Sequence, residues 1–283
     1  MKILIADSGS TKTDWCFIDC TKGIKQTAKT QGINPFYMTD EGIEAVLRNE
    51  LLTAIPDAAK VDGVYFYGAG LRPEMVGRMT KLLDDVFGAN VVEAANDLLG
   101  AARALFQQQE GIACILGTGS NSGLYNGKHI VANTPPMGFI LGDEGSGAVL
   151  GKLFLGALCK GLLPEGLLED FLNQTHQTVA DIIDAVYRKP LPNRYLAGVA
   201  PFIHSHLDVP EVEKIVVDNF RNFFQRNLSQ YRRHDLQVRA VGSIAYHFKA
   251  QFEMAARQEG FNSEIITEKS PLAGLVDYHV NVL

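Results

Sequence analysis

The feature that most constrains the fold is a pattern that occurs twice along the chain. Residues 2–31 follow the order strand, small polar loop, strand, glycine-containing turn and strand. Residues 112–133 repeat this order, with Asn126-Gly127 as the turn. Short apolar runs with such breaks are typical of strands that pair as an antiparallel meander. Because the two copies share their order but little sequence identity, we infer an internal duplication that gives two similar lobes.

Alternating helix and strand patterns follow the first meander. Apolar residues recur at helical spacing over 41–54 and 73–87, and a third helix begins at about residue 97. Between these helices, 61–67 and 90–94 are short apolar runs of strand length. The order βββαβαβα predicts an α/β lobe.

The second copy is interrupted by a mainly helical block over about 144–232. We therefore predict an α/β fold with a first lobe over 1–108 and a second lobe over 109–283 that contains this helical insertion. No Pro-, Gly- or Ser-rich linker marks the boundary, so we expect the lobes to share an interface and a hinge. We also expect the last helix to pack back on the first lobe. After the insertion, the patterns indicate a strand over 236–241, a helix over 244–258, a strand near 264–267 and a helix after Pro271.

Composition excludes several classes of partner. Of the 283 residues, 46% are apolar and 20% are charged, which is typical of a globular chain with a real core. The formal net charge is −6 and the basic residues are scattered, so we expect no nucleic-acid partner. No apolar run approaches the roughly 20 residues of a membrane span, and no secretory leader is evident, so we expect a cytoplasmic protein without a membrane partner. The four cysteines and seven histidines lack zinc-site spacing, so we expect reduced thiols, most of them buried.

Two loops have the composition that phosphate binding needs. The segments LIADSGSTKTD (4–14) and ILGTGSN (115–121) combine small residues with hydroxyls, so backbone N–H groups can approach an anion. Neither loop matches GxxxxGK[ST], and each joins two strands of a hairpin. Either loop alone is equally an ordinary turn, but one in each lobe favours a grip on nucleotide phosphates. Asp7 ends the first strand and is either a metal-side carboxylate or a turn cap, whereas Asp14 is interpreted as structural.

Three further motifs each admit a structural and a functional interpretation. Asn96-Asp97 lies between a strand and a helix, as a helix cap or as a carboxylate that accepts a proton. The segment GDEGS (142–146) precedes a helix-like run and also contains cap candidates. The segment VGS (241–243) is either a plain strand–helix turn or a place where a glycine lets a flat ring approach the backbone closely. Asn34, which precedes a proline, fits an ordinary turn as well as a ligand contact.

In this order, the motifs DSGSTKT (7–13), ND (96–97), GTGSN (117–121), GDEGS and VGS resemble the BadF/BadG/BcrA/BcrD ATPase family, especially its N-acetylglucosamine kinase branch. The resemblance covers nearly the whole chain, and GTGSN followed by GDEGS is its most specific part. It implies the two-lobed, duplicated ribonuclease H-like fold of actin-like ATPases. The implied activity is ATP-dependent phosphorylation of an amino sugar, most specifically N-acetylglucosamine at its 6-hydroxyl.

The resemblance also implies roles for individual residues. Asp97 is the implied general base, and Asp7 the implied contact of Mg²⁺. The implied ATP contacts are Ser10, Thr11, Lys12, Gly117, Thr118, Gly119, Gly242, Ser243 and Tyr246. The implied sugar contacts are Asn34, Asp97, Ser120, Asn121, Met137, Gly138 and Asp143. The run PPMGF (135–139) differs from the animal enzymes, so the identity of the sugar stays open.

Two alternatives remain within this resemblance. The first is an ATPase that drives a partner redox enzyme, a class whose activators hold an iron–sulfur cluster on paired cysteines. Cys114 falls in a predicted strand and Cys159 in a predicted helix, and neither shows such pairing. The second is a non-catalytic sugar or nucleotide sensor, for which we expect no DNA-binding module because the chain starts at its first strand. A homodimer is one option for the oligomeric state.

Overall fold

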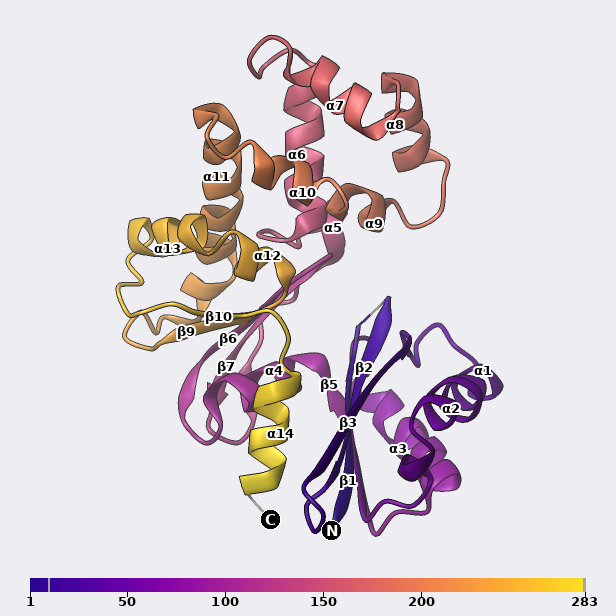
Figure 1. Ribbon diagram of the computed structural model, residues 1–283. Helices are drawn as coiled ribbons and strands as arrows, with labels where there is room; N and C mark the ends of the chain where they lie inside the picture. The colour runs from indigo at the N-terminus through magenta and orange to yellow at the C-terminus, as the bar shows by residue number, and fades with distance from the viewer. Residues whose placement is uncertain (10, 282–283) are drawn as a thin grey trace. The chain divides into compact units, whose positions relative to one another are not determined.

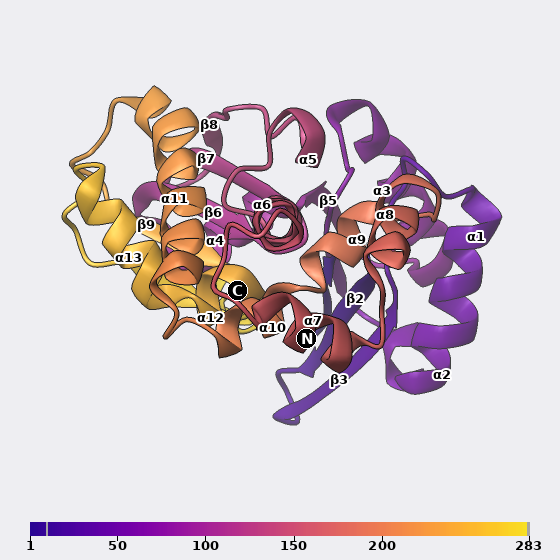
Figure 2. The ribbon, with the colours of Figure 1, turned by 90° about the horizontal axis from the view of Figure 1, so that it is seen from above.

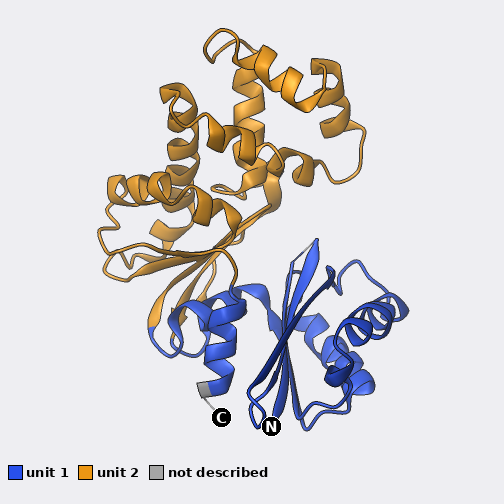
Figure 3. Ribbon diagram, in the orientation of Figure 1, with its two compact units in different colours: residues 1–109, 127–129, 271–283 blue, residues 110–126, 130–270 orange. Residues whose placement is uncertain are grey.

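The structure is a computed structural model that describes residues 1–9 and 11–281 (Figures 1 and 2). The chain divides into two compact units (Figure 3). Unit 1 comprises residues 1–109, 127–129 and 271–283, and unit 2 comprises residues 110–126 and 130–270. The predicted lobes differ from these units mainly in two places, because residues 127–129 and 271–283 belong to unit 1. That the predicted lobes are independent domains stays a prediction.

Unit 1 is built on a five-stranded mixed sheet with the order β3-β2-β1-β4-β5. The first three strands form the predicted antiparallel meander, and β4 and β5 continue the sheet in parallel with β1. Strands β1 and β4 lie in the middle and are buried along most of their length. The strands are β1 (Lys2–Ser8), β2 (Lys12–Asp19), β3 (Ile24–Gln31), β4 (Gly63–Gly68) and β5 (Val91–Asn96).

Helices cover both faces of the unit 1 sheet. Leu4 and Ala6 of β1 belong to one core cluster, whereas Ile3 and Ile5 belong to another, as expected from the two-residue period of a strand. The first cluster includes side chains of α1, η1 and α3, and the second includes side chains of α4 and α14. These elements are α1 (Asp40–Ala45), the π-helix η1 (Val46–Leu51), α2 (Leu52–Ala54), the 3₁₀-helix η2 (Pro56–Ala59), α3 (Pro73–Phe87), α4 (Asp97–Phe106) and α14 (Leu272–Asn281).

Unit 2 repeats the sheet of unit 1. Its strand order is β10-β9-β6-β7-β8. Read from β8, this order is third, second, first, fourth and fifth by appearance in the unit, the same as in unit 1. Pairing is antiparallel within β6, β7 and β8 and parallel among β6, β9 and β10. The strands are β6 (Glu110–Leu116), β7 (Ser120–Asn126), β8 (Ile130–Ala132), β9 (Val238–Val241) and β10 (Ile266–Glu268). The predicted two-lobed, duplicated α/β fold is therefore confirmed.

The hairpin loop of unit 2 is shorter than predicted. Ser120 and Asn121 pair with Leu116 and Ile115, so both belong to β7 and the loop itself comprises only Gly117–Gly119. Pairing across an antiparallel hairpin fixes which way successive side chains point, so Ser120 and Asn121 face opposite sides of the sheet.

The helical insertion of unit 2 surrounds a core rich in phenylalanine. Helix α11 packs along α13, and α6 packs against both α9 and α11 (Figure 2). The predicted helix over 244–258 is two helices that break at Phe248, whose ring is buried. The helices are α5 (Gly138–Leu141), α6 (Gly147–Cys159), α7 (Leu167–Thr175), α8 (Val179–Tyr187), α9 (Pro192–Ala197), α10 (Ala200–Ser205), α11 (Pro210–Arg226), the 3₁₀-helix η3 (Leu228–Tyr231), α12 (Ser243–His247) and α13 (Lys249–Gln258).

Two further expectations concern membranes and thiols. In the described parts of the chain, no helix has the length and apolar character to cross a bilayer. All four cysteines are free thiols, and Cys16 and Cys114 are buried whereas Cys20 is exposed.

Candidate active site

Three carboxylates gather at one edge of the unit 1 sheet. Asp7 of β1 lies directly opposite Asp14 of β2, so both side chains point to the same side. Parallel pairing carries the same edge through β4 to the end of β5, where Asp97 follows. The carboxyl ends of parallel strands are where ligands bind in open α/β sheets. The sequence pattern predicted no site role for Asp14, whereas the register places it beside Asp7.

The electrostatics of this edge favour a cation. Burial, followed by the negative charges of Asp97 and Asp14, raises the pKa of Asp7 to about 7, while Lys12 opposes this shift. Burial also raises the pKa of Asp97 to about 6, against the effect of backbone N–H donors. Nearby like charges disfavour ionisation, so a cation at this edge would stabilise the ionised carboxylates.

In the pair Asn96-Asp97, one residue is the helix cap, which the sequence could not assign to either of them. The Oδ1 atom of Asn96 accepts a hydrogen bond from the backbone N–H of Leu99 at 2.8 Å, so Asn96 is the N-cap of α4. Asp97 is the first residue of the helix, and its Oδ1 accepts from the N–H of Leu98 at 2.9 Å. The Asp97 carboxylate is thus not the cap of α4, and it lies at a helix end that stabilises negative charge.

Two buried hydroxyls hold the base of the hairpin loop between β1 and β2 in unit 1. Ser8 Oγ and Thr13 Oγ1 lie 2.7 Å apart, and both accept from the N–H of Ile33, at 3.0 and 3.2 Å. This fixes the segment that carries Asn34, whose Oδ1 accepts from the N–H of Phe36 at 3.0 Å in a turn.

The exposed tip of this loop carries the predicted phosphate contacts. Thr11 is exposed, and Lys12 Nζ lies 2.5 Å from Asp14 Oδ2. The N–H of Gly9 donates to the carbonyl of Lys12 at 3.0 Å. Ser10 lies outside the described residues.

The corresponding loop of unit 2, Gly117–Gly119, lies on the start of α6. The N–H groups of Gly147 and Ala148 donate to the carbonyls of Gly117 and Thr118, at 2.9 and 3.1 Å. The first N–H groups of a helix have no partner within the helix, so here two of them hold the loop. Loop position is thereby set by the helix.

Gly242 is required by backbone packing beside this loop. Its φ of 118° lies in a region that side chains rarely adopt, and an added Cβ would lie 2.3 Å from the carbonyl oxygen of Leu116. Ser243 and Tyr246 follow in α12 and are exposed. Because β6 and β9 are parallel neighbours, Gly242 and the Gly117–Gly119 loop share one edge of the unit 2 sheet.

Predicted sugar contacts from two segments meet in unit 2. The carboxylate of Asp143 accepts a hydrogen bond from the backbone N–H of Ser120, and a Cβ on Gly119 would lie 3.1 Å from its Oδ2. Ser120 Oγ donates to the carbonyl of Glu144 at 2.8 Å. Asp143 has a left-handed φ of 54°, and burial raises its pKa to about 6. Backbone strain in a non-glycine residue is more common at ligand sites than elsewhere.

The segment before Asp143 forms a closed loop. The N–H of Asp143 donates to the carbonyl of Pro136 at 2.7 Å, which brings both ends of the loop together. Met137 and Gly138 lie in between with left-handed φ values of 60° and 74°, and the side chain of Met137 is exposed.

Sequence reasoning missed Asn219, which positions the GDEGS segment. This residue of α11 is buried; its Oδ1 accepts from the N–H of Gly145 at 3.0 Å, and its Nδ2 donates to the carbonyl of Ser146 at 3.3 Å. Its signal in the sequence is an asparagine three residues after Val216 and four before Phe223, a spacing that places it on the apolar face of an amphipathic helix.

The donor set in unit 1 fits one Mg²⁺ that is bound together with a nucleotide. Among the described residues, no group of three or more His, Cys, Asp or Glu side chains is placed to hold a metal ion. Mg²⁺ is commonly held by one or two carboxylates plus phosphates and water. Asp7, with its raised pKa and its acidic neighbours, fits that arrangement.

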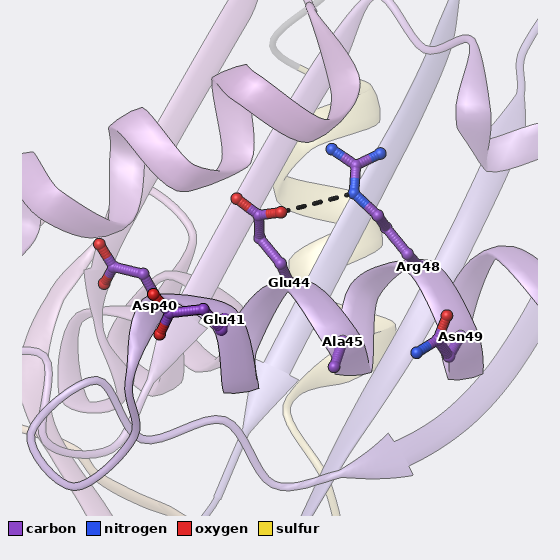
Figure 4. Close-up of a pocket in the computed structure, with 6 residues that line it drawn as sticks. All are labelled: Asp40, Glu41, Glu44, Ala45, Arg48 and Asn49. Carbon is purple, nitrogen blue, oxygen red and sulfur yellow. Dashed lines mark ion pairs between the residues drawn. The ribbon is translucent and has the colours of Figure 1, made fainter.

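A pocket of about 260 Å³ lies elsewhere in unit 1, on α1 and η1 (Figure 4). Its charged lining includes Glu44 and Arg48, whose Oε2 and Nε atoms are 3.6 Å apart. None of the predicted site residues lines it. The lining residues are Asp40, Glu41, Glu44, Ala45, Arg48 and Asn49.

Comparison with known proteins finds structural relatives over the full chain. A protein from Porphyromonas gingivalis, named as a candidate N-acetylglucosamine kinase, is 49% identical with a TM-score of 0.94, and the match covers 99% of each chain. Another candidate N-acetylglucosamine kinase, from Chromobacterium violaceum, is 18% identical with a TM-score of 0.77 and 98% of each chain covered.

A glucokinase from Streptomyces griseus, solved with glucose and AMPPNP, shares the fold at 15% identity and a TM-score of 0.56, with 98% of each chain covered. No protein-family profile matches, and no curated protein matches. The 49% identity over the full length carries the assignment, because the other two matches show the fold alone. The chain therefore belongs to the N-acetylglucosamine kinase-like branch of the BadF/BadG/BcrA/BcrD ATPase family, a branch of sugar kinases.

Proposed function

We propose that this protein transfers a phosphoryl group from ATP to an amino sugar, most specifically to the 6-hydroxyl of N-acetylglucosamine. The observation that carries the proposal is Asp97, a desolvated carboxylate at the start of α4 that Asn96 relieves of the capping role. It occurs in a chain that is 49% identical over its full length to a candidate N-acetylglucosamine kinase.

In this proposal, Asp97 accepts the proton of the attacking hydroxyl. A pKa of about 6 makes the carboxylate a stronger base than an exposed aspartate while it stays ionised at neutral pH. Bound beside Asp7, Mg²⁺ would neutralise charge that develops on the transferred phosphoryl group. Backbone N–H groups and hydroxyls of the two hairpin loops, with Thr11, Lys12 and Thr118, hold the phosphates.

The remaining residues position the two substrates. Hydroxyls of the sugar are bound by Asn34, Asn121 and Asp143, and Ser120 contributes through its backbone N–H, which holds the Asp143 carboxylate. The Met137-Gly138 segment forms the wall beside the ring. The contact between the Asp143 carboxylate and the backbone of Ser120 supports a shared role of these two segments in binding the sugar. The adenine ring lies against Gly242, with Ser243 and Tyr246 at its edge.

A sugar panel tests the proposal. Purified protein with Mg-ATP is incubated with N-acetylglucosamine, N-acetylmannosamine, glucosamine and glucose, and the release of ADP is measured against sugar-free controls. We expect the highest kcat/KM for N-acetylglucosamine. Phosphorylation of none of these sugars would contradict the kinase assignment, and a clear preference for glucose would contradict the amino-sugar specificity.

A further inference from the structure

Backbone chemistry fixes the orientation of the Asn121 carboxamide. Its Oδ1 atom lies 2.9 Å from the backbone nitrogen of Ser122. A backbone N–H can only donate, so the Asn121 atom that faces it is the oxygen and not the nitrogen. The Nδ2 amino group of Asn121 therefore points away from Ser122. Among the described residues, Nδ2 has no hydrogen-bond partner.

Asn133 provides a second donor to the same oxygen. Its Nδ2 atom lies 2.7 Å from the carbonyl oxygen of Ser122 and 3.3 Å from that of Thr134. Carbonyl oxygens only accept, so this atom of Asn133 is the amino nitrogen. The same nitrogen lies 2.9 Å from Asn121 Oδ1 and donates to it. Two independent donors, one of them backbone, thus occupy the Asn121 oxygen.

The position of Asn133 is set by the helical insertion. The next residue, Thr134, donates from its N–H to the hydroxyl of Tyr231 at 3.1 Å and from Oγ1 to the carbonyl of Asn227 at 3.0 Å. Tyr231 in turn donates to the carbonyl of Ser122 at 2.9 Å. The strand end that carries Asn121 and the segment that carries Asn133 are therefore joined through the same tyrosine.

We propose that Asn133 is a positioning residue that presents Asn121 to the sugar as a hydrogen-bond donor. This inference rests on the proposed function, in which Asn121 contacts the acceptor sugar. With its oxygen occupied, Asn121 offers only N–H groups, so the group it recognises has an oxygen lone pair, as a hydroxyl or an acetamido carbonyl has. A carboxamide free to rotate would accept and donate alike and would select less sharply between acceptor sugars.

The test changes Asn133 and leaves the site residues untouched. Asn133→Asp replaces the donor by a carboxylate that faces three acceptor oxygens, those of Asn121, Ser122 and Thr134. We expect the KM for the sugar to rise roughly five- to tenfold because the donor to Asn121 is lost. The KM for ATP and the melting temperature should stay unchanged, because Asn133 is exposed and the Ser122 carbonyl keeps Tyr231 as a donor. Asn133→Ala should give a smaller rise, and Asn262→Asp, another exposed asparagine of unit 2, should give none.

Deoxy analogues of the sugar identify the atom that Asn121 binds. For the analogue that lacks this oxygen, wild type and Asn133→Asp should have the same kcat/KM, whereas for the other analogues the difference persists. An active wild type with an unchanged sugar KM in Asn133→Asp, or an equal rise of the KM for ATP, would overturn this inference alone. A wild type that phosphorylates no sugar would instead contradict the proposed function, and the inference with it.

Discussion

At the scale of single residues, neighbouring side chains of the site have different roles, because hydrogen bonds assign one of them to the backbone. Asn96 and Asp97 are adjacent, yet only Asn96 is the N-cap of α4, so the Asp97 carboxylate is not needed for that role. The sequence predicted both roles for this pair but could not divide them, because either side chain is able to cap a helix.

Replacing Asp97 tests its role as the base. Asp97→Asn keeps the shape of the side chain but cannot accept the proton, so we expect kcat to fall about 10²- to 10⁴-fold with the sugar dissociation constant nearly unchanged. Turnover is measured by ADP release and binding by calorimetry. Asp85→Asn, at an exposed position of α3, is the matched control. Wild-type turnover in Asp97→Asn would remove Asp97 from the mechanism.

Asn219 provides a second test at this scale. Asn219→Leu keeps the volume but leaves the buried N–H of Gly145 without its acceptor, which costs about 1–3 kcal/mol of the free energy of unfolding. Urea denaturation measures this loss, and the KM for the sugar should rise because Asp143 is on the same segment. Asn173→Leu, at an exposed position of α7, should change stability by less than about 0.5 kcal/mol. Equal stability of the two variants would refute the positioning role.

At the scale of elements, two glycines in unit 2 allow opposite predictions. Gly242→Ala forces a Cβ against the carbonyl of Leu116 at an unfavourable φ, so we expect a loss of at least about 1–3 kcal/mol in stability. Gly156→Ala lies within α6 with no atom near the added methyl group, and should stabilise by about 0.5–1 kcal/mol. Thermal unfolding of both variants measures the difference. A neutral Gly242→Ala would mean that β6 and β9 do not approach as closely as described.

Helix α14 is fastened to the unit 1 sheet by a neutral histidine. The hydroxyl of Tyr67 accepts from Arg103 at 2.6 Å and lies 2.8 Å from His279 Nε2. This contact fits a neutral imidazole, whose tautomer sets whether the Tyr67 hydroxyl or His279 Nε2 donates. The His279 ring stacks on Tyr65 with centroids 3.8 Å apart. Burial, and the positive charge of Arg103, lower the pKa of His279 to about 3.

This lowered pKa predicts a pH dependence of stability. Between pH 6.5 and 3 the unfolded chain binds a proton at His279 that the folded chain does not, so stability falls as the pH falls. From pH 7.5 to pH 5, the loss from this residue is roughly 2 kcal/mol, at about 1.4 kcal/mol per pH unit below 6.5. Urea unfolding across this range should show a shallower slope for His279→Gln than for wild type. Identical slopes would show that His279 titrates normally in the fold.

Element boundaries show where sequence patterns lose information. The helical spacing over 41–54 was recognised, but the π-helix Val46–Leu51 inside it was not, because a single extra residue per turn barely alters the apolar pattern. Likewise, Phe248 is apolar at a helical position, so the apolar pattern runs on through the break between α12 and α13, where the backbone of Phe248 leaves the helical region at φ −105° and ψ 32°.

At the scale of the whole molecule, the duplication was readable because each sheet repeats the same order of strands and turns. The identical strand orders of the two units confirm it. The Asn121–Asn133 contact was not readable from sequence, because it depends on how Tyr231 joins segments about a hundred residues apart along the chain. The candidate site residues could thus be predicted from the sequence, whereas their hydrogen-bond partners could not.

The central claim is that the chain phosphorylates N-acetylglucosamine at its 6-hydroxyl. The most direct measurement is a ³¹P–¹H correlation spectrum of the product formed from N-acetylglucosamine and Mg-ATP. We predict a phosphate ester that correlates with the two protons on carbon 6, at a yield that grows with time and disappears in Asp97→Asn. A phosphate on any other carbon, or release of inorganic phosphate with no sugar ester, would contradict the account.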